Sequence, residues 1–357
     1  MKRTNQPKKS KSIKFRKLLI SVPLLGILLL CLYVMVLAVL PPRIQAGRLG
    51  QSQAHAGEEL AHSLDIGLAA QASYPSAPLS VVRDLGVADG VRTQVVSFKV
   101  EDDGISEFAL MEQPASAPSA KGYPAIILCH GYANPDRYLT NLAYVDDMNF
   151  YAKKGFAVIK PDFRGQGLSI GHGEANSAYY SMDYNIDVMS LISALKQTKN
   201  IDKSNLNLWG HSMGAYIALR AAVMSRDIKN TILLSEPGGS IRDIYLSYVP
   251  PSDENNLVAL KTRSDAFSKY GTPAENPGFW QKASPSNYLT QMVSKVQIHV
   301  GSADVIVPPQ LSADLDVALT NAHKTHQYYV YTDIGHGLAE VRSLIWSRSL
   351  NLMTGNP

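Results

Sequence analysis

The sequence predicts an α/β protein with an open, mostly parallel sheet of eight strands and helices on both faces. Short apolar runs alternate with longer amphipathic segments from about residue 94 onward, as expected for strands joined by crossover helices. Apolar residues make up 45% of the chain and charged residues 18%, which excludes a disordered or coiled-coil protein. The 317 residues after position 40 suffice for one large domain or two ordinary ones.

Charge is distributed unevenly along the chain. The formal net charge of +4 comes from residues 1–17, which hold eight Lys or Arg and no acidic residue. Residues 41–357 hold 26 basic and 30 acidic residues, a net charge of −4. A domain with this balance is not expected to bind nucleic acid.

Residues 18–40 form an uncharged apolar stretch of 23 residues. As a helix it would extend about 34 Å, enough to cross about 30 Å of hydrocarbon. We therefore expect a single-pass anchor in the lipid bilayer, with the N-terminus in the cytoplasm and the folded part outside it. A signal peptide cleaved after Val36-Leu37-Ala38 is the alternative. The chain has no Asn-X-Ser/Thr sequon, which favours a bacterial cell envelope as its location.

The chain is expected to divide into four segments. Residues 1–17 are a basic cytoplasmic tail, 18–40 the transmembrane anchor, 41–93 a stalk or linker, or a helix lying on the domain, and 94–357 the folded domain. The first two strands are expected at VVSFKV and FALMEQ, joined by a turn at Asp102-Asp103-Gly104. Residues 237–289 contain several prolines and are expected to form a small helical lid. Only two cysteines occur, Cys31 and Cys129, so no disulfide is expected within the folded domain.

Six further apolar runs read as parallel strands of the sheet. They are YPAIILC, FAVIKP, LNLW, NTILLSE, KVQIHVG and HQYYVYT. Continuous apolar runs are typical of strands that are buried on both faces. In such sheets the ligand site lies beyond the carboxyl ends of the strands.

The motif Gly210-His211-Ser212-Met213-Gly214 follows one of these strands and precedes the helical stretch AYIALRAAV. Glycines on both sides of the serine permit a strained strand-to-helix turn that exposes the hydroxyl group. The motif predicts Ser212 as a nucleophile. A glycine-bounded turn with an incidental serine is the structural alternative.

A serine nucleophile needs a histidine base that is oriented by an acid. Asp304 and His336 follow later strands, in the chain order that a serine hydrolase of this topology requires. His323 and His326 lie near the start of the last strand, at the wrong end of the sheet. Glu236, which follows another strand, is the rival acid.

An acyl-transfer site also needs two hydrogen-bond donors for the developing oxyanion. The backbone N–H groups of Met213 and Tyr132 are the candidates, Tyr132 because it follows the strand YPAIILC. His130 is expected to pack in that loop, and the glycine-rich stretch at 164–167 to serve loop structure and not phosphate binding. No metal-ligand spacing occurs, so no metal or cofactor is expected.

Together these motifs resemble the catalytic domain of the α/β-hydrolase superfamily. The resemblance rests on HGYANP, PDFRGQGLS, GHSMG, NPGFWQKASPSNYL, VGSADVIVPP and DIGHG, in this order. The nearest branch is the prolyl oligopeptidase (S9) family with its dipeptidyl-aminopeptidase and acylaminoacyl-peptidase relatives, over residues 94–350. The resemblance implies that Ser212, Asp304 and His336 are nucleophile, acid and base. Peptidases of this family carry a β-propeller, for which the roughly 50 residues between the apolar stretch and the first strand leave no room.

The expected function is that of a membrane-anchored serine hydrolase which cleaves a small ester or peptide substrate through an acyl-enzyme. A carboxylesterase or lipase-type hydrolase is the first alternative. A non-catalytic interaction protein with the α/β-hydrolase fold is the second. The sequence leaves the oligomeric state open.

Overall fold

The computed structural model describes residues 59–100, 105–135, 137–169, 181–247 and 257–355. The chain divides after residue 54 into two units, and all described residues belong to the second. The predicted tail, the apolar stretch 18–40 and the first part of the predicted linker lie outside the described residues. Within the described ranges, no helix has the length and apolar character needed to cross a membrane.

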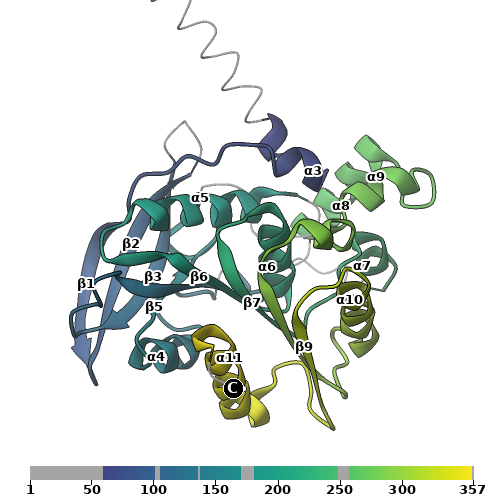
Figure 1. Cartoon of the computed structure of the whole chain (residues 1–357). Helices are drawn as coiled ribbons and strands as arrows, with labels where there is room; N and C mark the ends of the chain where they lie inside the picture. The colour runs from purple at the N-terminus through teal and green to yellow at the C-terminus, as the bar shows by residue number, and fades with distance from the viewer. Residues whose placement is uncertain (1–58, 101–104, 136, 170–180, 248–256, 356–357) are drawn as a thin grey trace, which may run out of the picture. The chain divides into compact units, whose positions relative to one another are not determined.

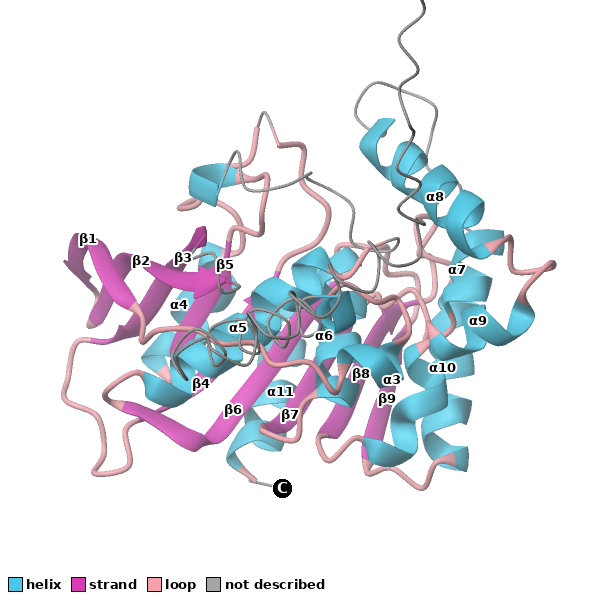
Figure 2. Ribbon diagram, turned by 90° about the horizontal axis from the view of Figure 1, so that it is seen from above, coloured by secondary structure: helices cyan, strands magenta, loops and turns pink. Residues whose placement is uncertain are grey.

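A sheet of nine strands forms the centre of the domain (Figures 1 and 2). Its spatial order is β1-β2-β3-β5-β4-β6-β7-β8-β9. The last six strands in this order run parallel to one another, and the first three pair antiparallel. The strands are β1 Ser80–Ala88, β2 Val91–Val100, β3 Ile105–Pro114, β4 Tyr123–Cys129, β5 Ala157–Pro161, β6 Ile201–His211, β7 Ile228–Leu234, β8 Lys295–Gly301 and β9 His326–Tyr331. The predicted mostly parallel sheet is confirmed.

The strand β1 corrects the expectation of eight strands. It lies within residues 41–93, which were expected to be a linker, so the sheet begins at Ser80 and not near residue 94. Every residue of β1 is exposed. The strand therefore lacks the alternation of apolar and polar residues by which a half-buried strand is recognised in a sequence. The signal that marks it is the turn Asp89-Gly90, where both residues have positive φ angles of 50° and 78°. The predicted hairpin between β2 and β3 is confirmed by the pairing of Val100 with Ile105.

Helices cover both faces of the sheet. On one face α5 (Asp183–Gln197), α6 (Met213–Met224) and α10 (Pro309–Asn321) pack against the strands, and α4 (Val145–Lys153) and α11 (Arg342–Thr354) pack on the other. Short 3₁₀ turns occur at Gly167–Ser169 (η1) and Ala339–Val341 (η4). Strand β4 illustrates why both faces of the sheet are covered. Its Ala125 and Ile127 side chains point into one apolar core, whereas Ile126 and Leu128 point into the other.

The described part of the predicted linker lies on the domain. Helix α3 (Ile66–Ala69) packs against α6, and its Ile66 and Ala69 side chains are fully buried. The Asp65 carboxylate caps this helix by accepting a hydrogen bond from the Gly67 N–H at 2.9 Å. Two alternatives were expected for this segment, a stalk or a helix on the domain. Residues 59–79 fit the second alternative better, because α3 packs on the domain.

Helices separate β7 from β8, in the segment 237–289 that was predicted to be a helical lid. They are α7 Ile241–Ser247, α8 Leu257–Tyr270, α9 Pro277–Lys282 and the 3₁₀ helix η3 Pro285–Gln291. Trp280 holds them together: its ring packs against Tyr245 and Phe267, and its indole N–H donates to the Gly271 carbonyl at 2.9 Å.

Candidate active site

Ser212 occupies a strained turn between β6 and α6. Its backbone has φ 55° and ψ −123°, a conformation that non-glycine residues rarely adopt. The flanking glycines are required by close backbone approaches. A side chain at Gly214 would begin 2.0 Å from the Cys129 carbonyl oxygen, and one at Gly210 would begin 2.4 Å from the Gly214 oxygen. The predicted strand-turn-helix context of Ser212 is confirmed.

The structure brings Asp304 and His336 together beyond the ends of β8 and β9. His336 Nδ1 lies 2.7 Å from Asp304 Oδ2. The other oxygen, Oδ1, accepts hydrogen bonds from the Ile306 and Val307 N–H groups, each at 2.9 Å. The carboxylate is therefore held in one orientation, with one oxygen turned to the imidazole.

The two loops that carry this pair lie directly against each other. A side chain at Gly301, the last residue of β8, would begin 2.1 Å from the Ile334 carbonyl oxygen. The Asp333 N–H also donates to Ser302 Oγ at 2.9 Å. The glycine is therefore needed for the close approach that joins acid and histidine.

Electrostatics keep the Asp304 carboxyl ionised. Burial alone would raise its pKa, but hydrogen bonds from His336 and from two backbone N–H groups outweigh burial and lower the pKa below the ordinary value. An ionised acid can orient the imidazole and stabilise its protonated form.

His211, the residue before Ser212, connects the candidate site to the neighbouring loop. Its Nε2 lies 3.0 Å from the His336 carbonyl oxygen, and its Nδ1 lies 2.8 Å from the Tyr144 hydroxyl. Because a carbonyl only accepts, Nε2 must carry the proton, and Tyr144 must donate to Nδ1. The Tyr144 oxygen in turn accepts from the Gly131 N–H at 3.0 Å. Burial lowers the pKa of His211 to about 4, so the ring stays neutral.

A second donor holds the same carbonyl group. Ser235 Oγ donates to the His336 oxygen at 2.8 Å, and Ser235 itself has a positive φ of 46°. The His336 loop is thus fixed from the ends of both β6 and β7. The sequence analysis did not single out Ser235, Tyr144 or this role of His211. Only the position of Ser235 near the end of the predicted strand NTILLSE could have signalled it.

Ser212 and His336 lie at the same edge of the sheet, but the structure shows no hydrogen bond between these two described residues. The ring of His211, the residue before Ser212, lies next to that of His336, with 5.0 Å between the two ring centroids. Catalytic hydrogen bonds are often long in the absence of substrate, so the lack of a Ser212–His336 hydrogen bond is compatible with a catalytic pair.

One oxyanion-hole candidate directly follows Ser212, and the other lies in the loop after β4. Met213 is the first residue of α6 and is buried. Tyr132 follows Gly131, at which an added side chain would begin 3.3 Å from the His211 carbonyl oxygen. The loop after β4 therefore lies against the Ser212 turn, as the prediction requires.

Glu236, which follows β7, and His130, which follows β4, are both fully buried. Glu236 Oε2 accepts from the Gly238 N–H at 2.8 Å, and burial raises the pKa of this carboxyl to about 8. His130 stacks on Tyr138, and burial together with the Lys160 charge lowers its pKa to about 4. Asp304, and not Glu236, contacts His336.

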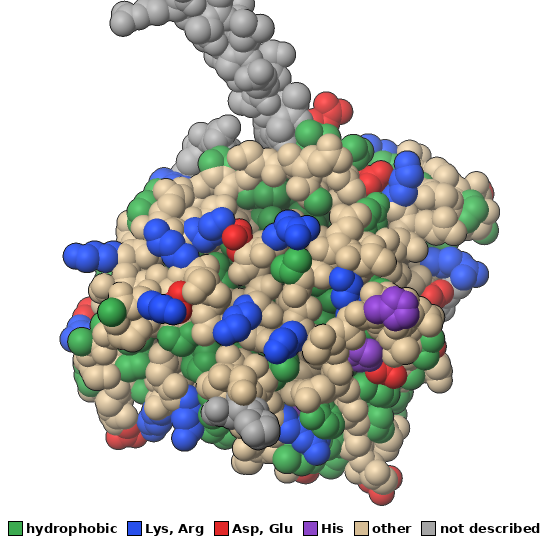
Figure 3. All heavy atoms as spheres, in the orientation of Figure 1, with side chains coloured by type: hydrophobic (Ala, Val, Ile, Leu, Met, Phe, Trp, Pro, Cys, Tyr) green, Lys and Arg blue, Asp and Glu red, His purple; other side chains and the backbone are tan. Residues whose placement is uncertain are grey.

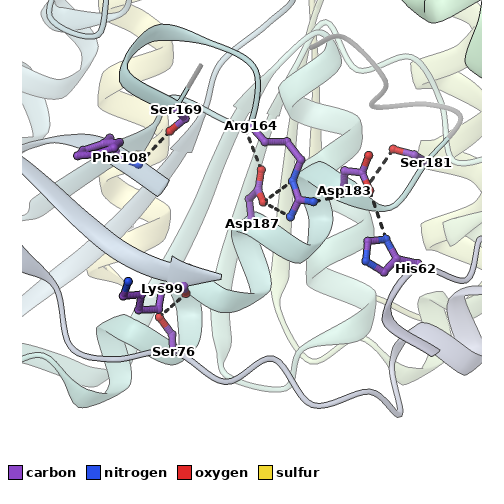
Figure 4. Close-up of polar contacts among 9 residues, drawn as sticks. All are labelled: His62, Ser76, Lys99, Phe108, Arg164, Ser169, Ser181, Asp183 and Asp187. Atoms are coloured by element: carbon purple, nitrogen blue, oxygen red, sulfur yellow. Dashed lines mark hydrogen bonds and ion pairs between the residues drawn. The ribbon is translucent and has the colours of Figure 1, made fainter. Parts of the chain in front are cut away.

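The glycine-rich stretch at 164–167 serves loop structure, as predicted. The Arg164 guanidinium donates from Nη2 and Nε to Asp187 Oδ1 at 2.6 and 2.9 Å, and its backbone N–H donates to the other oxygen (Figure 4). Arg164 also approaches Asp183, which pairs with His62 of the N-terminal segment. The buried ion pair between Arg164 and Asp187 fixes the loop after β5 to α5.

A cleft of about 650 Å³ opens beside the His336 loop. The residues that line it include Leu142, Tyr144, His211, Gly337, Arg342 and Trp346. Across the described ranges, no group of three or more His, Cys, Asp or Glu side chains is placed to hold a metal ion.

Comparison with known proteins assigns the chain to a family. The model of the prolyl oligopeptidase family (Peptidase_S9) matches residues 143–351, which contain Ser212, Asp304 and His336. The chain belongs to the prolyl oligopeptidase family. The proteins and solved structures that the chain resembles include peptidases and esterases.

The curated relatives are matched by this chain over only part of their own length. The protein named uncharacterized peptidase YtmA of Bacillus subtilis is 25% identical over 187 residues, which cover 52% of this chain and 66% of that protein. The chain spans between 26% and 66% of the length of the curated relatives matched first.

Two solved structures show the α/β-hydrolase fold of the domain. An acetyl xylan esterase from Paenibacillus sp. R4 has a TM-score of 0.59 at 17% identity, with 85% of this chain and 93% of that chain covered. Porphyromonas gingivalis dipeptidyl peptidase 4 has a TM-score of 0.58 at 20% identity, with 74% and 36% covered.

Proposed function

We propose that the protein is a membrane-anchored serine hydrolase in which Ser212, Asp304 and His336 form the catalytic triad. The observation that carries the proposal is the 2.7 Å contact between His336 Nδ1 and Asp304 Oδ2, together with the strained turn of Ser212 at the same edge of the sheet. That contact leaves Nε2 as the imidazole nitrogen that accepts a proton from Ser212.

The proposed reaction has two steps. Ser212 Oγ attacks the substrate carbonyl carbon while His336 Nε2 takes the hydroxyl proton. Asp304 stabilises the imidazolium, which returns the proton to the departing alcohol or amine. Water, activated by the same imidazole, attacks the acyl-enzyme and releases the acid. The N–H groups of Met213 and Tyr132 donate to the oxyanion in both steps.

The substrate is a small ester or peptide, part of which occupies the cleft beside the His336 loop. Support for this placement comes from the lining of the cleft by His211 and Gly337, the direct neighbours of two triad residues. A carboxylesterase is the second candidate. It is supported by the similarity of the fold to an acetyl xylan esterase, 93% of which is covered by the match.

Residues 18–40 serve as the membrane anchor in this proposal, with the catalytic domain outside the cytoplasm and the protein in a bacterial cell envelope. The support is the uncharged length of this stretch and the eight basic residues that precede it.

A fluorophosphonate probe tests the catalytic proposal. It should label the wild-type protein and leave Ser212→Ala unlabelled, with both proteins shown to be folded by circular dichroism. kcat/KM for a short p-nitrophenyl ester should exceed that for an aminoacyl-p-nitroanilide, because an alcohol leaves more readily than an amine. Labelling that persists in Ser212→Ala would place the nucleophile elsewhere. A preference for the amide would favour the peptidase over the carboxylesterase.

A further inference from the structure

The edge of the sheet at which the six parallel strands begin is strongly basic. Nine Lys or Arg and two carboxylates lie within four residues before, or two residues after, the first residue of these strands. The nine are Lys121 near β4, Lys153 and Lys154 near β5, Lys199 and Lys203 near β6, Arg226 and Lys229 near β7, Lys295 at β8 and Lys324 near β9. We call this surface the basic edge.

The basic edge is open to solvent. All of its cations are exposed except Lys324, which is partly buried. The two carboxylates are Asp202 and Asp227, and Asp227 is already paired with Lys196 at 2.8 Å. Figure 3 shows Lys and Arg side chains spread over the face on which the parallel strands begin, with few Asp or Glu among them.

Helix ends do not account for this charge. Cations are favoured near helix C-termini by the helix dipole, and helices do end close to the starts of the strands. Among the cations of the basic edge, however, only Lys153 lies in the last turn of a helix, and Lys154 follows it at the C-cap. Helices α6 and α10 have no basic residue in their last turns. The other cations lie in loops or at strand starts.

The catalytic edge has the opposite balance. Around the ends of the same six strands, from two residues before to four residues after the last residue, stand four carboxylates and two cations. Both cations, Lys160 and Arg164, are buried. The carboxylates are Asp162, Glu236, Asp304 and Asp333. The domain is therefore electrically polar along its strands, although residues 41–357 carry a net charge of −4.

We propose that the basic edge docks on an anionic lipid surface, so that the catalytic edge faces away from the bilayer. This inference rests on the anchor of the proposed function. Residues 41–58 separate the anchor from the first described residue, and even fully extended they reach only about 60 Å. A tether of this length keeps the domain at high effective concentration near the bilayer, so that weak electrostatic contacts suffice. The enzyme then acts on substrates that arrive from the aqueous phase.

Energy transfer to lipid-borne acceptors tests this orientation with the full-length protein in vesicles. A fluorophore is attached at Ser204→Cys on the basic edge, or at Asn141→Cys in the exposed loop after β4, both in a Cys31→Ala background. Cys129 is buried and should not react. Vesicles contain phosphatidylcholine alone or with phosphatidylglycerol. In anionic vesicles we expect transfer from position 204 to rise several-fold, and transfer from position 141 to stay low. The rise should vanish at 1 M salt, where the Debye length is about 3 Å.

Charge reversal supplies the matched comparison. Lys199→Glu, Lys229→Glu and Lys295→Glu together should abolish the rise, because these exposed lysines are spread over three strand starts. The control carries the same change of charge at Arg83, Lys261 and Lys269, which lie on β1 and α8, and should keep the rise. Hydrolysis of a soluble ester by the basic-edge variant should match that of the wild type, since Lys199, Lys229 and Lys295 lie at the opposite ends of the strands from the catalytic edge.

The outcomes separate this proposal from the proposed function. Equal transfer from position 204 in neutral and anionic vesicles would overturn the docking, whatever the activity. Loss of the rise in the control variant would show that overall charge, and not the basic edge, is responsible. Retention of duplex DNA by the basic edge at a salt concentration that abolishes the rise would assign the surface to nucleic acid instead. Release of the protein by alkaline carbonate would reject the anchor, and absence of ester hydrolysis would reject the catalytic proposal, each measured independently of the transfer.

Discussion

Replacement of Glu236 by glutamine should make the protein more stable at alkaline pH. Glu236 is fully buried, and burial raises its pKa from 4.5 to about 8 against a smaller opposing effect of the Gly238 N–H. The folded protein therefore keeps a proton that the unfolded chain releases above about pH 4.5. Stability from this group is fully present below that pH and is lost as the pH rises to about 8. Glutamine preserves the shape and the acceptor for Gly238 but cannot ionise.

The size of the effect follows from the shift. A change of about 3.5 pKa units corresponds to on the order of 4 to 5 kcal/mol between the two ends of this pH range. At pH 5 the variant and the wild type should therefore be nearly equally stable. At pH 9 the Glu236→Gln variant should gain a free energy of unfolding approaching that magnitude.

Urea unfolding at pH 5, 7 and 9 measures this difference. Glu275→Gln is the control, because Glu275 is exposed and hydrogen bonds from Thr272 lower its pKa, so that no alkaline gain is expected. An unchanged pH dependence in Glu236→Gln would mean that the carboxyl is ionised within the fold. Ester hydrolysis by Glu236→Gln should also remain close to the wild-type rate, and its loss in a folded variant would make Glu236 the catalytic acid.

Three further substitutions probe the candidate site. Asp304→Asn should lower kcat by on the order of 10⁴, close to the damage of Ser212→Ala, because the imidazole then takes the wrong tautomer; a kinetic assay in which activity survives would argue against this acid. Tyr144→Phe keeps the packed ring but removes the donor to His211. It should lower kcat about 10-fold (about 1.4 kcal/mol) with little change in KM. An effect on KM alone would contradict a role of Tyr144 in positioning His211. Gly214→Ala should give no soluble folded protein, because the new methyl group would lie 2.0 Å from a β4 carbonyl oxygen, and native circular dichroism would show that the turn adapts.

The parallel part of the fold could be predicted because burial on both faces leaves a strong trace in the sequence. Strand β4 is a continuous apolar run and β7 ends in one, and the residues with chemical function follow the ends of such runs. The same reasoning placed Ser212, Asp304 and His336 at one edge of the sheet. Their catalytic roles remain predictions.

What could not be predicted depends on contacts between distant segments. The Tyr144 hydroxyl meets His211 across 67 positions of sequence, and no local pattern marks a tyrosine for that contact. Ser235 follows β7 and reaches the carbonyl of His336, which follows β9, two strands further along the sheet. The strand β1 was missed for a different reason: a strand that buries no side chain has no apolar alternation to detect.

That exposed strand affects where the chain can be shortened. A protein that began at residue 94 would lack β1 and the first residues of β2, leaving the backbone N–H and C=O groups of β2 unpaired along the sheet. Such an open strand edge is a template for pairing with another chain. β1 itself is a poorer template, because register shifts interrupt its ladder at Val81/Arg83 and Asp84/Gly86. An N-terminal truncation for soluble expression should therefore keep everything from residue 59 onward, since a shorter protein would replace an irregular edge with a regular, aggregation-prone one.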